Sequence, residues 1–462
     1  MNQQEKFDKL FRKYPHPTAT FSQRPHLSRR RFLNLAGTGV TASWLTSLPA
    51  STVITSTPVT MVNKAKNVIF ILLAGAPSHT DTFDFKMVPG TTPASFSPGT
   101  ANGITFPAGL MPKLAGMTGQ FAVVRSMQAW ALVHSLAQTW TQIGRNPAGV
   151  LGNVSPNIGS VVAIEKNVER TPSQVFPTFL ALNSAGAAGP GYFPASYAPF
   201  KVTPSTSGLS NTTNADGQTR FNSRWSFLHQ LDGPLRTNSP YGQPLDDYDL
   251  FYTAANGMMY NPTVTKAFSY TAAESTSYGS TSFGNACVLA RQVLAANQGT
   301  RYIEITLGGW DMHVNIYAAN QLPTLAKQLD NGLSQLMTDL QADGTLSETL
   351  IVMAGEFGRT VGALTGAAGR DHLQQQFAFF AGAGVTGGKI IGATDPTGAT
   401  TTSFGWSRDR IVKPEDIEAT IYSAMGINWT TVRYDDPLGR GFYYVPNSDQ
   451  DIYGPINELW QP

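Results

Sequence analysis

Residues 68–84 read VIFILLAGAPSHTDTFD, an apolar run followed by a loop of small, polar and acidic residues. An apolar run without polar alternation is typical of a strand that is buried on both faces of a parallel sheet. Three further runs have this character and end in small or polar residues: 121–124, 350–354 and 377–381. Residues 302–307 alternate apolar with polar side chains, which predicts a fifth strand nearer an edge of the sheet.

Helical patterns lie between these runs. Leucines recur at spacings of three and four through residues 322–340, which predicts a helix with one apolar stripe over a sheet face. A second helix is predicted over 414–425, because Pro414 suits the first helical position and two acidic residues follow it. Strands that alternate with helices predict an α/β fold with a mostly parallel central sheet and helices on both faces.

Two segments depart from this alternation. Residues 183–283 are rich in Ser, Thr, Asn, Gly and Tyr, and we interpret them as a loop-rich insertion or cap with short helices. Residues 28–33 read SRRRFL and precede an uncharged apolar run, the layout of a secretory signal with a twin-arginine head. That run is shorter than the ~20 apolar residues of a stable membrane span. We therefore predict a targeting segment over 1–50, one domain over 51–462, and export in folded form to the periplasm or beyond.

Composition excludes several classes of protein. The chain has 462 residues, and its 32 Lys and Arg against 30 Asp and Glu give a formal net charge of +2. That balance provides no strong field for a polyanion, so we do not expect nucleic-acid binding. The 44 glycines and 30 prolines predict many turns, while 41% hydrophobic residues can still bury a large core. A single cysteine, Cys287, excludes a disulfide framework and a multi-cysteine metal site.

Histidines and carboxylates recur where the predicted strands end. The carboxyl ends of parallel strands share one edge of a sheet, and ligands bind there. Four of the seven histidines lie in or near these loops, and three of the four have a carboxylate within two positions. These pairs are His79 with Asp81, His313 with Asp311, and His372 with Asp371. Mixed nitrogen and oxygen ligands suit zinc, manganese or iron better than magnesium or calcium. The alternative interpretation is a loop carboxylate that caps a helix or orients a histidine.

Four strings carry a resemblance to a known family: residues 67–84, 308–313, 356–360 and 370–372. Together with the twin-arginine head, they resemble the bacterial exported family known as domain of unknown function family 1501. The similarity continues through the closing helix and tail. That family is placed in the alkaline-phosphatase-like superfamily, whose distant relatives include sulfatases and phosphoglycerate mutases. The resemblance implies an alkaline-phosphatase-like fold and hydrolysis of a phosphate or sulfate ester with one or two metals.

The resemblance also implies roles for individual residues. Asp311 and His313 resemble a ligand pair that follows a middle strand, and His372 resembles the last histidine ligand. Glu356 occupies the position at which relatives have the aspartate of an Asp-His pair. From its planar fork, and apart from the resemblance, we expect Arg359 to clamp the oxyanion. His79, Asp81, Asp84 and Asp371 are further ligands or orienting groups.

Three positions depart from the superfamily pattern. Ala74-Gly75 stands where relatives have a pair of aspartates. Phe357 stands where they have a histidine ligand. His134, with Ser135 beside it, stands where they have the nucleophile. Three alternatives follow. In the first, His79 and Asp81 replace the lost first-strand ligand, and His134 or Ser135 serves as nucleophile or ligand. In the second, water attacks at the metal. In the third, the pocket binds a metal or an anion without catalysis.

The function that these residues favour is metal-dependent hydrolysis of a sulfate or phosphate ester, on a small-molecule or glycan substrate. The expected cofactor is a divalent metal, with zinc, manganese and calcium as candidates. His134, Ser135 and Arg359 are the candidates for catalysis. The alternative function is a non-catalytic exported protein that binds a metal, an anionic glycan or a protein partner. Neither function is expected to involve a stable transmembrane anchor.

Overall fold

The structure is a computed structural model, and it describes residues 53–236 and 243–461. The predicted targeting segment, residues 1–50, lies outside the described residues. Among the described residues, no helix combines the length and the apolar character that a membrane crossing requires.

A sheet of eight strands organises the described part of the chain. Its order is β13-β5-β12-β9-β2-β8-β6-β7, and only β12 pairs antiparallel with its neighbours. The bounds are β2 (Asn67–Leu73), β5 (Phe121–Gln128), β6 (Phe179–Leu182), β7 (Phe200–Val202), β8 (Tyr302–Thr306), β9 (Thr349–Gly355), β12 (Gln375–Ala381) and β13 (Lys389–Ile391). The predicted α/β fold with a mostly parallel sheet is thus confirmed.

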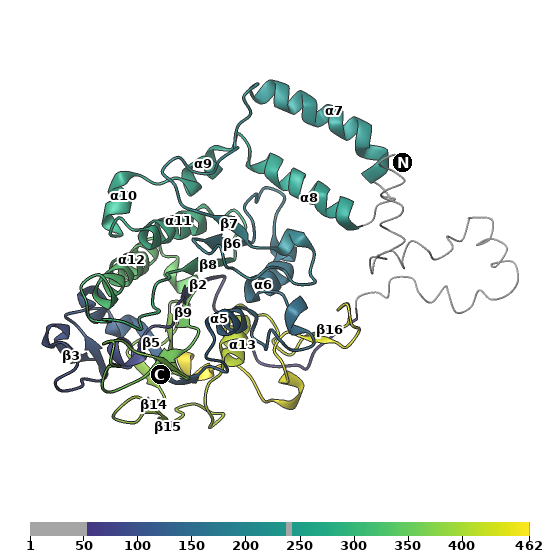
Figure 1. Ribbon diagram of the computed structural model, residues 1–462. Coiled ribbons are helices and arrows are strands. Elements are labelled where there is room, and N and C mark those ends of the chain that lie inside the picture. The colour runs from purple at the N-terminus through teal and green to yellow at the C-terminus, as the bar shows by residue number, and fades with distance from the viewer. Residues whose placement is uncertain (1–52, 237–242, 462) are drawn as a thin grey trace, which may run out of the picture. The chain divides into compact units, whose positions relative to one another are not determined.

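Shorter strands and the helices surround this sheet (Figure 1). The short strands are β1 (Ile54–Thr55), β3 (Pro98–Ala101), β4 (Ile104–Pro107), β10 (Gly358–Arg359), β11 (His372–Leu373), β14 (Ala393–Thr394), β15 (Thr401–Ser403), β16 (Val432–Arg433) and β17 (Phe442–Tyr443). The α-helices are α4 (Pro112–Ala115), α5 (His134–Ile143), α6 (Ile158–Lys166), α7 (Gln218–Arg236), α8 (Gln243–Met258), α9 (Pro262–Phe268), α10 (Ala272–Ser277), α11 (Ser282–Ala296), α12 (Leu322–Ala342) and α13 (Pro414–Ala424).

The central strands feed two hydrophobic cores, one on each face of the sheet. Along β2, Ile69 and Ile71 enter one core while Val68 and Phe70 enter the other, because successive side chains of a strand point to opposite faces. The first core includes α11 and α12, and the second includes α6 and α13. The leucine stripe of α12 is buried as its spacing predicts. Helices therefore cover both faces.

Three features of the sheet differ from the sequence-based expectations. The run at 377–381 is not a parallel strand, since β12 enters the sheet from the opposite end. Residues 302–307 do not lie near an edge, because β8 pairs with β2 on one side and β6 on the other. The predicted insertion, residues 183–283, contains the edge strand β7, and its helices α7 and α8 are longer than predicted.

Candidate metal centre

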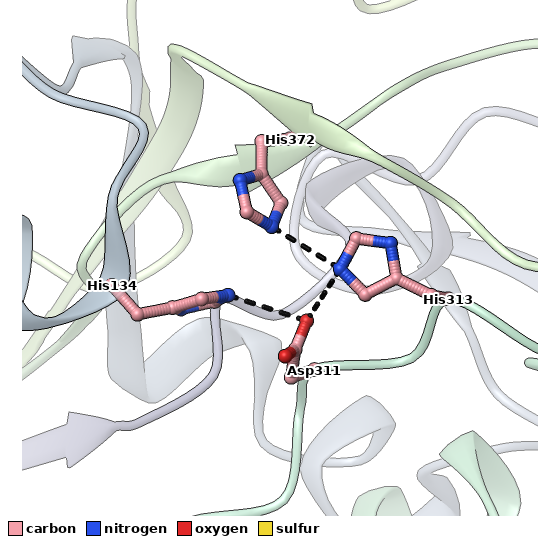
Figure 2. Close-up of side chains that lie close together, drawn as sticks. All are labelled: His134, Asp311, His313 and His372. Atoms are coloured by element: carbon pink, nitrogen blue, oxygen red, sulfur yellow. Dashed lines mark hydrogen bonds and ion pairs between the residues drawn. The ribbon is translucent and has the colours of Figure 1, made fainter.

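Four side chains converge at one edge of the sheet: His134, Asp311, His313 and His372 (Figure 2). Each offers one ligand atom, and these atoms all lie within 4.8 Å of one another. His134 opens α5 after strand β5, and Asp311 and His313 lie in the loop after β8. His372 comes just before β12, so the reversed strand brings a ligand to the same edge. We call these four residues the His3Asp cluster.

The spacing within the His3Asp cluster matches that of ligands around one ion. Nε2 of His313 lies 2.8 Å from Oδ1 of Asp311 and 3.2 Å from Nε2 of His372. Nε2 of His134 lies 3.2 Å from the same Asp311 oxygen. Zinc–nitrogen bonds of about 2.0–2.1 Å in a tetrahedral site place neighbouring ligand atoms about 3.3 Å apart. The donor set therefore fits a small divalent ion in size and in chemistry.

A second observation supports this fit. Nε2 of His134 is buried and makes no hydrogen bond, although Oδ1 of Asp311 lies 3.2 Å from it, and Oε2 of Glu356 is also buried without a hydrogen-bond partner. A buried polar atom without a partner costs free energy, so such atoms require an explanation. For His134, a lone pair directed among three other donor atoms would be satisfied by a metal.

The Nδ1 atoms of His134 and His372 are held from behind by protein oxygens, and that of His313 has a carboxylate oxygen near it but beyond hydrogen-bond distance. Nδ1 of His134 lies 2.7 Å from Oε1 of Glu356, and Nδ1 of His372 lies 2.8 Å from the carbonyl oxygen of Leu132. Nδ1 of His313 lies 3.8 Å from Oδ1 of Asp371. An acceptor at Nδ1 places the proton there and leaves Nε2 with its lone pair, as in many metal-binding histidines.

Glycines allow the loops of the site to approach closely. Gly75 has φ +106°, and a Cβ there would lie 2.6 Å from the backbone nitrogen of Asp311. A Cβ on Gly358 would lie 1.9 Å from the carbonyl oxygen of Gln375. Because Gly358 begins β10, which pairs Arg359 with His372, this glycine lets the β10–β11 hairpin fold against the start of β12.

Arg359 is a buried cation in direct contact with the cluster. Its Nη2 donates to Oδ1 of Asp311 at 2.6 Å and to the carbonyl oxygen of Gly75. Its Nη1 lies 3.2 Å from Nε2 of His313 and 3.3 Å from the carbonyl oxygen of Arg370. Its Nε donates to the carbonyl oxygen of Ala76 at 2.8 Å. These contacts engage all five N–H groups of the guanidinium. In this arrangement Arg359 has no free donor with which to clamp an oxyanion.

Burial and charge act on the pKa values of two cluster residues. Partial burial raises the pKa of Asp311, but the hydrogen bond and charge of Arg359 outweigh it, and the net pKa is lowered. Burial lowers the pKa of His372, and the nearby charge of Arg359 lowers it further. A deprotonated carboxylate and a neutral imidazole are the forms that bind a metal.

The structure places the other predicted site residues outside the donor set. Glu356 and Asp371 lie behind histidines rather than among the ligand atoms. Ser135 is exposed in the first turn of α5, beside His134. His134 was expected to act in catalysis, with a ligand role left open, and it lies in the donor set.

His79 and Asp81 are buried and make contacts outside the donor set. Both Asp81 oxygens accept hydrogen bonds, from Ser78 and Arg370 at Oδ2 and from Tyr317 at Oδ1. Nε2 of His79 contacts the carbonyl oxygen of Gly398, and burial lowers the pKa of this histidine. Asp84 accepts from Thr394 and pairs with cations. In this arrangement the three residues contribute nothing to the cluster.

Three contacts at the site were not anticipated from the sequence. Gln138 and the backbone N–H of Gly75 both donate to Oε1 of Glu356, and the carbonyl oxygen of Leu132 accepts from His372. Gln138 follows His134 by four residues, a helical spacing that places two side chains on one face. That spacing is a usable signal, whereas backbone partners such as Leu132 leave no trace in residue type.

Exposed apolar side chains border the cluster. Trp130, Leu132 and Val133 precede His134 directly, and Val314 follows His313. Trp130 stacks on Trp140 with ring centroids 6.0 Å apart. Grouped apolar side chains at a surface indicate a place where a ligand or partner is bound.

Comparisons with known proteins give a family and a set of similar structures. The family described as "Protein of unknown function (DUF1501)" matches residues 65–450. No curated protein matches the sequence. One similar solved structure is the PsFucS1 sulfatase from Pseudoalteromonas sp., at 12% identity and a TM-score of 0.37, with 79% of this chain and 68% of that chain covered.

Two further solved structures are similar to this chain to a comparable degree. The phosphonate monoester hydrolase SpPMH from Silicibacter pomeroyi is 12% identical with a TM-score of 0.36, over 86% of this chain and 76% of that chain. A protein in the alkaline phosphatase superfamily from Vibrio parahaemolyticus is 11% identical with a TM-score of 0.36, over 81% of this chain and 69% of that chain.

Proposed function

The chain belongs to the DUF1501 family of proteins of unknown function, and we propose that it is a metal-dependent hydrolase of phosphate or sulfate esters. The observation that carries this proposal is the convergence of three imidazole Nε2 atoms and one carboxylate oxygen in the His3Asp cluster. The carboxyl edge of an open α/β sheet is where such folds bind their ligands, and the cluster lies there.

The proposed ligands are His134, Asp311, His313 and His372. When bound, a divalent ion supplies Lewis-acid stabilisation of the negative charge on a phosphate or sulfate group. The protein supplies the orientation of the ligands, through Glu356, Leu132 and Asp371. Zinc or manganese suits three nitrogens and one oxygen better than calcium does.

The amino end of α5 adds a second attraction for an anion. The amides of its first turn have no acceptor within the helix, and the helix dipole is positive at this end. Since His134 is the first residue of α5, an anion at the cluster would lie beside these amides. Attraction for the anion would thus come from the cluster and from the helix together.

The apolar rim favours an ester whose non-reacting part is aromatic or apolar. Leu132, Val133 and Val314 adjoin proposed ligands in the chain and are exposed, and burying apolar area stabilises binding by about 25 cal/mol per Å². Aryl phosphates and aryl sulfates are therefore the first substrates to test, ahead of small polar esters.

Two groups remain for the attack on the ester: the hydroxyl of Ser135 and water. Ser135 is exposed and follows a proposed ligand in the first turn of α5, which makes it the protein hydroxyl to test. The variant Ser135→Ala separates the two, because loss of turnover assigns the serine and retained turnover assigns water.

The experiment that tests the proposed function has two measurements. Metal content of the purified chain is determined first, and turnover of aryl phosphate and aryl sulfate is then measured with added zinc or manganese. We expect bound metal and turnover, both lost in His313→Ala. The proposed function is contradicted if the chain holds no metal and turns over neither ester under any of these conditions.

A non-catalytic binding protein is the second candidate function, and one observation favours it. All five N–H groups of Arg359 are engaged by protein acceptors, so the site offers no free guanidinium donor for a transition state. Bound metal that depends on His313, without turnover of either ester, would support this function.

The proposed place of action is outside the cytoplasm. This proposal depends on the twin-arginine pattern at residues 28–33 and the apolar run after it. Fractionation of cells that express the full chain tests it, with Arg29→Lys/Arg30→Lys as the variant. We expect the wild-type chain in the exported fraction and the variant in the cytoplasm.

A further inference from the structure

Arg359 and a metal ion would require the same atom of His313. Nη1 of Arg359 lies 3.2 Å from Nε2 of His313, the atom that also lies within 3.2 Å of His372 and Asp311. An unprotonated imidazole nitrogen has one lone pair, and it accepts one hydrogen bond or binds one ion. The contact with Arg359 and the bond to an ion therefore exclude each other.

The charge of Arg359 opposes an ion in the same place. The guanidinium is 1% exposed, and its Nη2 is 2.6 Å from the Asp311 oxygen that the ion would need. Two positive charges a few ångströms apart repel each other, and the burial of Arg359 limits the screening of its charge by water. The ion pair with Arg359 also offsets part of the negative charge of Asp311, which weakens the attraction that the carboxylate would offer a second cation.

Arg359 is fixed in this position by atoms outside the cluster. The carbonyl oxygens of Gly75, Ala76 and Arg370 accept from it, and β10 pairs Arg359 directly opposite His372. Because the guanidinium is planar and rigid, a movement of Nη1 away from His313 also shifts the contacts that Nη2 and Nε make with Gly75 and Ala76. The guanidinium is thus anchored on one side and shared with the cluster on the other.

From these contacts we infer that Arg359 is an internal cation that competes with the divalent ion for Asp311 and His313, and so sets the metal affinity of the site. The inference depends on the metal site of the proposed function. Release of the His313 contact leaves one N–H of Arg359 without a protein acceptor, available to the anion of a substrate. Until its contact with His313 is released, Arg359 positions Asp311 and His313 and does not touch a substrate.

The test measures zinc affinity by competition with a chromogenic chelator, on the purified full chain. Arg359→Met and Arg359→Gln remove the charge, while Arg359→Lys keeps it. We expect both neutral variants to bind zinc more tightly than the wild type, by about tenfold or more, and the lysine variant to stay near the wild type. Arg125→Met is the matched control, since Arg125 is a half-buried cation paired with Asp84 and does not contact the cluster.

The outcomes separate this inference from the proposed function. The inference is overturned if both neutral variants bind zinc no more tightly than the wild type. The metal site still stands in that case, provided that the wild type binds zinc and His313→Ala abolishes the binding. No zinc binding by any variant, the wild type included, overturns both. If the neutral variants do not fold, a crystal structure of the zinc-loaded wild type decides. The inference then requires that Nη1 of Arg359 no longer contacts Nε2 of His313, and a retained contact beside a bound ion refutes it.

Discussion

The three histidines of the His3Asp cluster direct their Nε2 atoms toward one another and toward Asp311, so loss of one ring should affect the whole site. We expect His313→Ala to lower zinc affinity by more than about 100-fold, since Nε2 of His313 is the central atom of the cluster. Isothermal titration with zinc measures this. His229→Ala is the control, because His229 lies in α7 and contacts the carbonyl oxygen of Trp225. A similar loss in both variants would contradict the assignment.

Glu356 gives a second prediction at the residue scale. Its Oε1 accepts from Nδ1 of His134, so Glu356→Gln weakens the contact that orients the ring. We expect zinc affinity to fall by about 10–100-fold, the usual effect of removing such an acceptor. Asp371→Asn should have a smaller effect, because Asp371 is exposed and 3.8 Å from His313. An effect of Asp371→Asn as large as that of Glu356→Gln would contradict the ranking.

Residue type predicts which groups gather at the site better than it predicts what each group does. The sequence places Glu356 at the end of a strand, on the edge that carries His134. The direction of its carboxylate depends on donors from elsewhere in the chain, the N–H of Gly75 and the side chain of Gln138. Those contacts form only in the folded chain, so ligand and orienting group could not be distinguished beforehand.

At the scale of elements, the loop after β2 and the loop after β8 touch through their backbones. Gly75→Ala would place a Cβ 2.6 Å from the nitrogen of Asp311 at a φ of +106°. We expect the free energy of unfolding to fall by about 2 kcal/mol or more and zinc affinity to fall with it, because Asp311 must move. Urea unfolding and zinc titration measure the two effects.

Gly90→Ala is the matched control for this prediction. Gly90 also has positive φ, at +74°, but nothing lies within 4 Å of the Cβ that would be added. The cost should be about 1 kcal/mol, from backbone conformation alone, with no change in zinc affinity. Equal losses of stability in the two variants would mean that contact with the Asp311 loop has no effect.

The direction of β12 shows what periodicity can and cannot predict. An apolar run such as 377–381 has the same pattern in either direction. The burial of the strand was therefore predictable, and its direction in the sheet was not. A parallel crossover needs a dozen or more residues and usually a helix. Between β9 and β12 the chain instead forms the β10–β11 hairpin, which returns it antiparallel. The absence of a helical pattern over residues 356–374 was a signal for that reversal.

At the scale of the whole molecule, a buried carboxyl in the central sheet makes stability depend on pH. Burial raises the pKa of Glu304 from 4.5 to about 7, against a hydrogen bond from Asn157 and the charge of Lys201. The folded chain therefore holds this proton where the unfolded chain has lost it. Stability from Glu304 is full below pH about 4.5 and is lost as pH rises toward about 7, by about 3 kcal/mol.

The variant Glu304→Gln removes this titration. Its free energy of unfolding should exceed that of the wild type at pH 8 and should approach it at pH 5, as measured by urea unfolding at both values. Glu348→Gln is the control, because Glu348 is exposed and pairs with Lys66 at the surface. A pH slope that is unchanged in Glu304→Gln would show that other groups dominate it.

The sequence predicted the architecture of the whole molecule more fully than its site. Burial that follows from local pattern was predictable. It defines the strands of the sheet, as in the apolar runs 68–73 and 350–354, and the helix that packs on one face, through the leucine stripe of α12. Which loops meet is decided by strand order, which local pattern does not encode. His79 follows β2 as closely as His313 follows β8, yet its contacts lie outside the donor set.

The reversed strand β12 has a consequence for synthesis. The ligands of the His3Asp cluster come from α5, the loop after β8 and the turn into β12, and the last of these segments follows the first by more than half of the chain. A ribosome releases residues in order, so a nascent chain holds His134 long before His372 exists. Three ligands precede the strand that brings the fourth. The complete donor set is thus a late product of translation, and a chain truncated before residue 372 would carry the early ligands without the site.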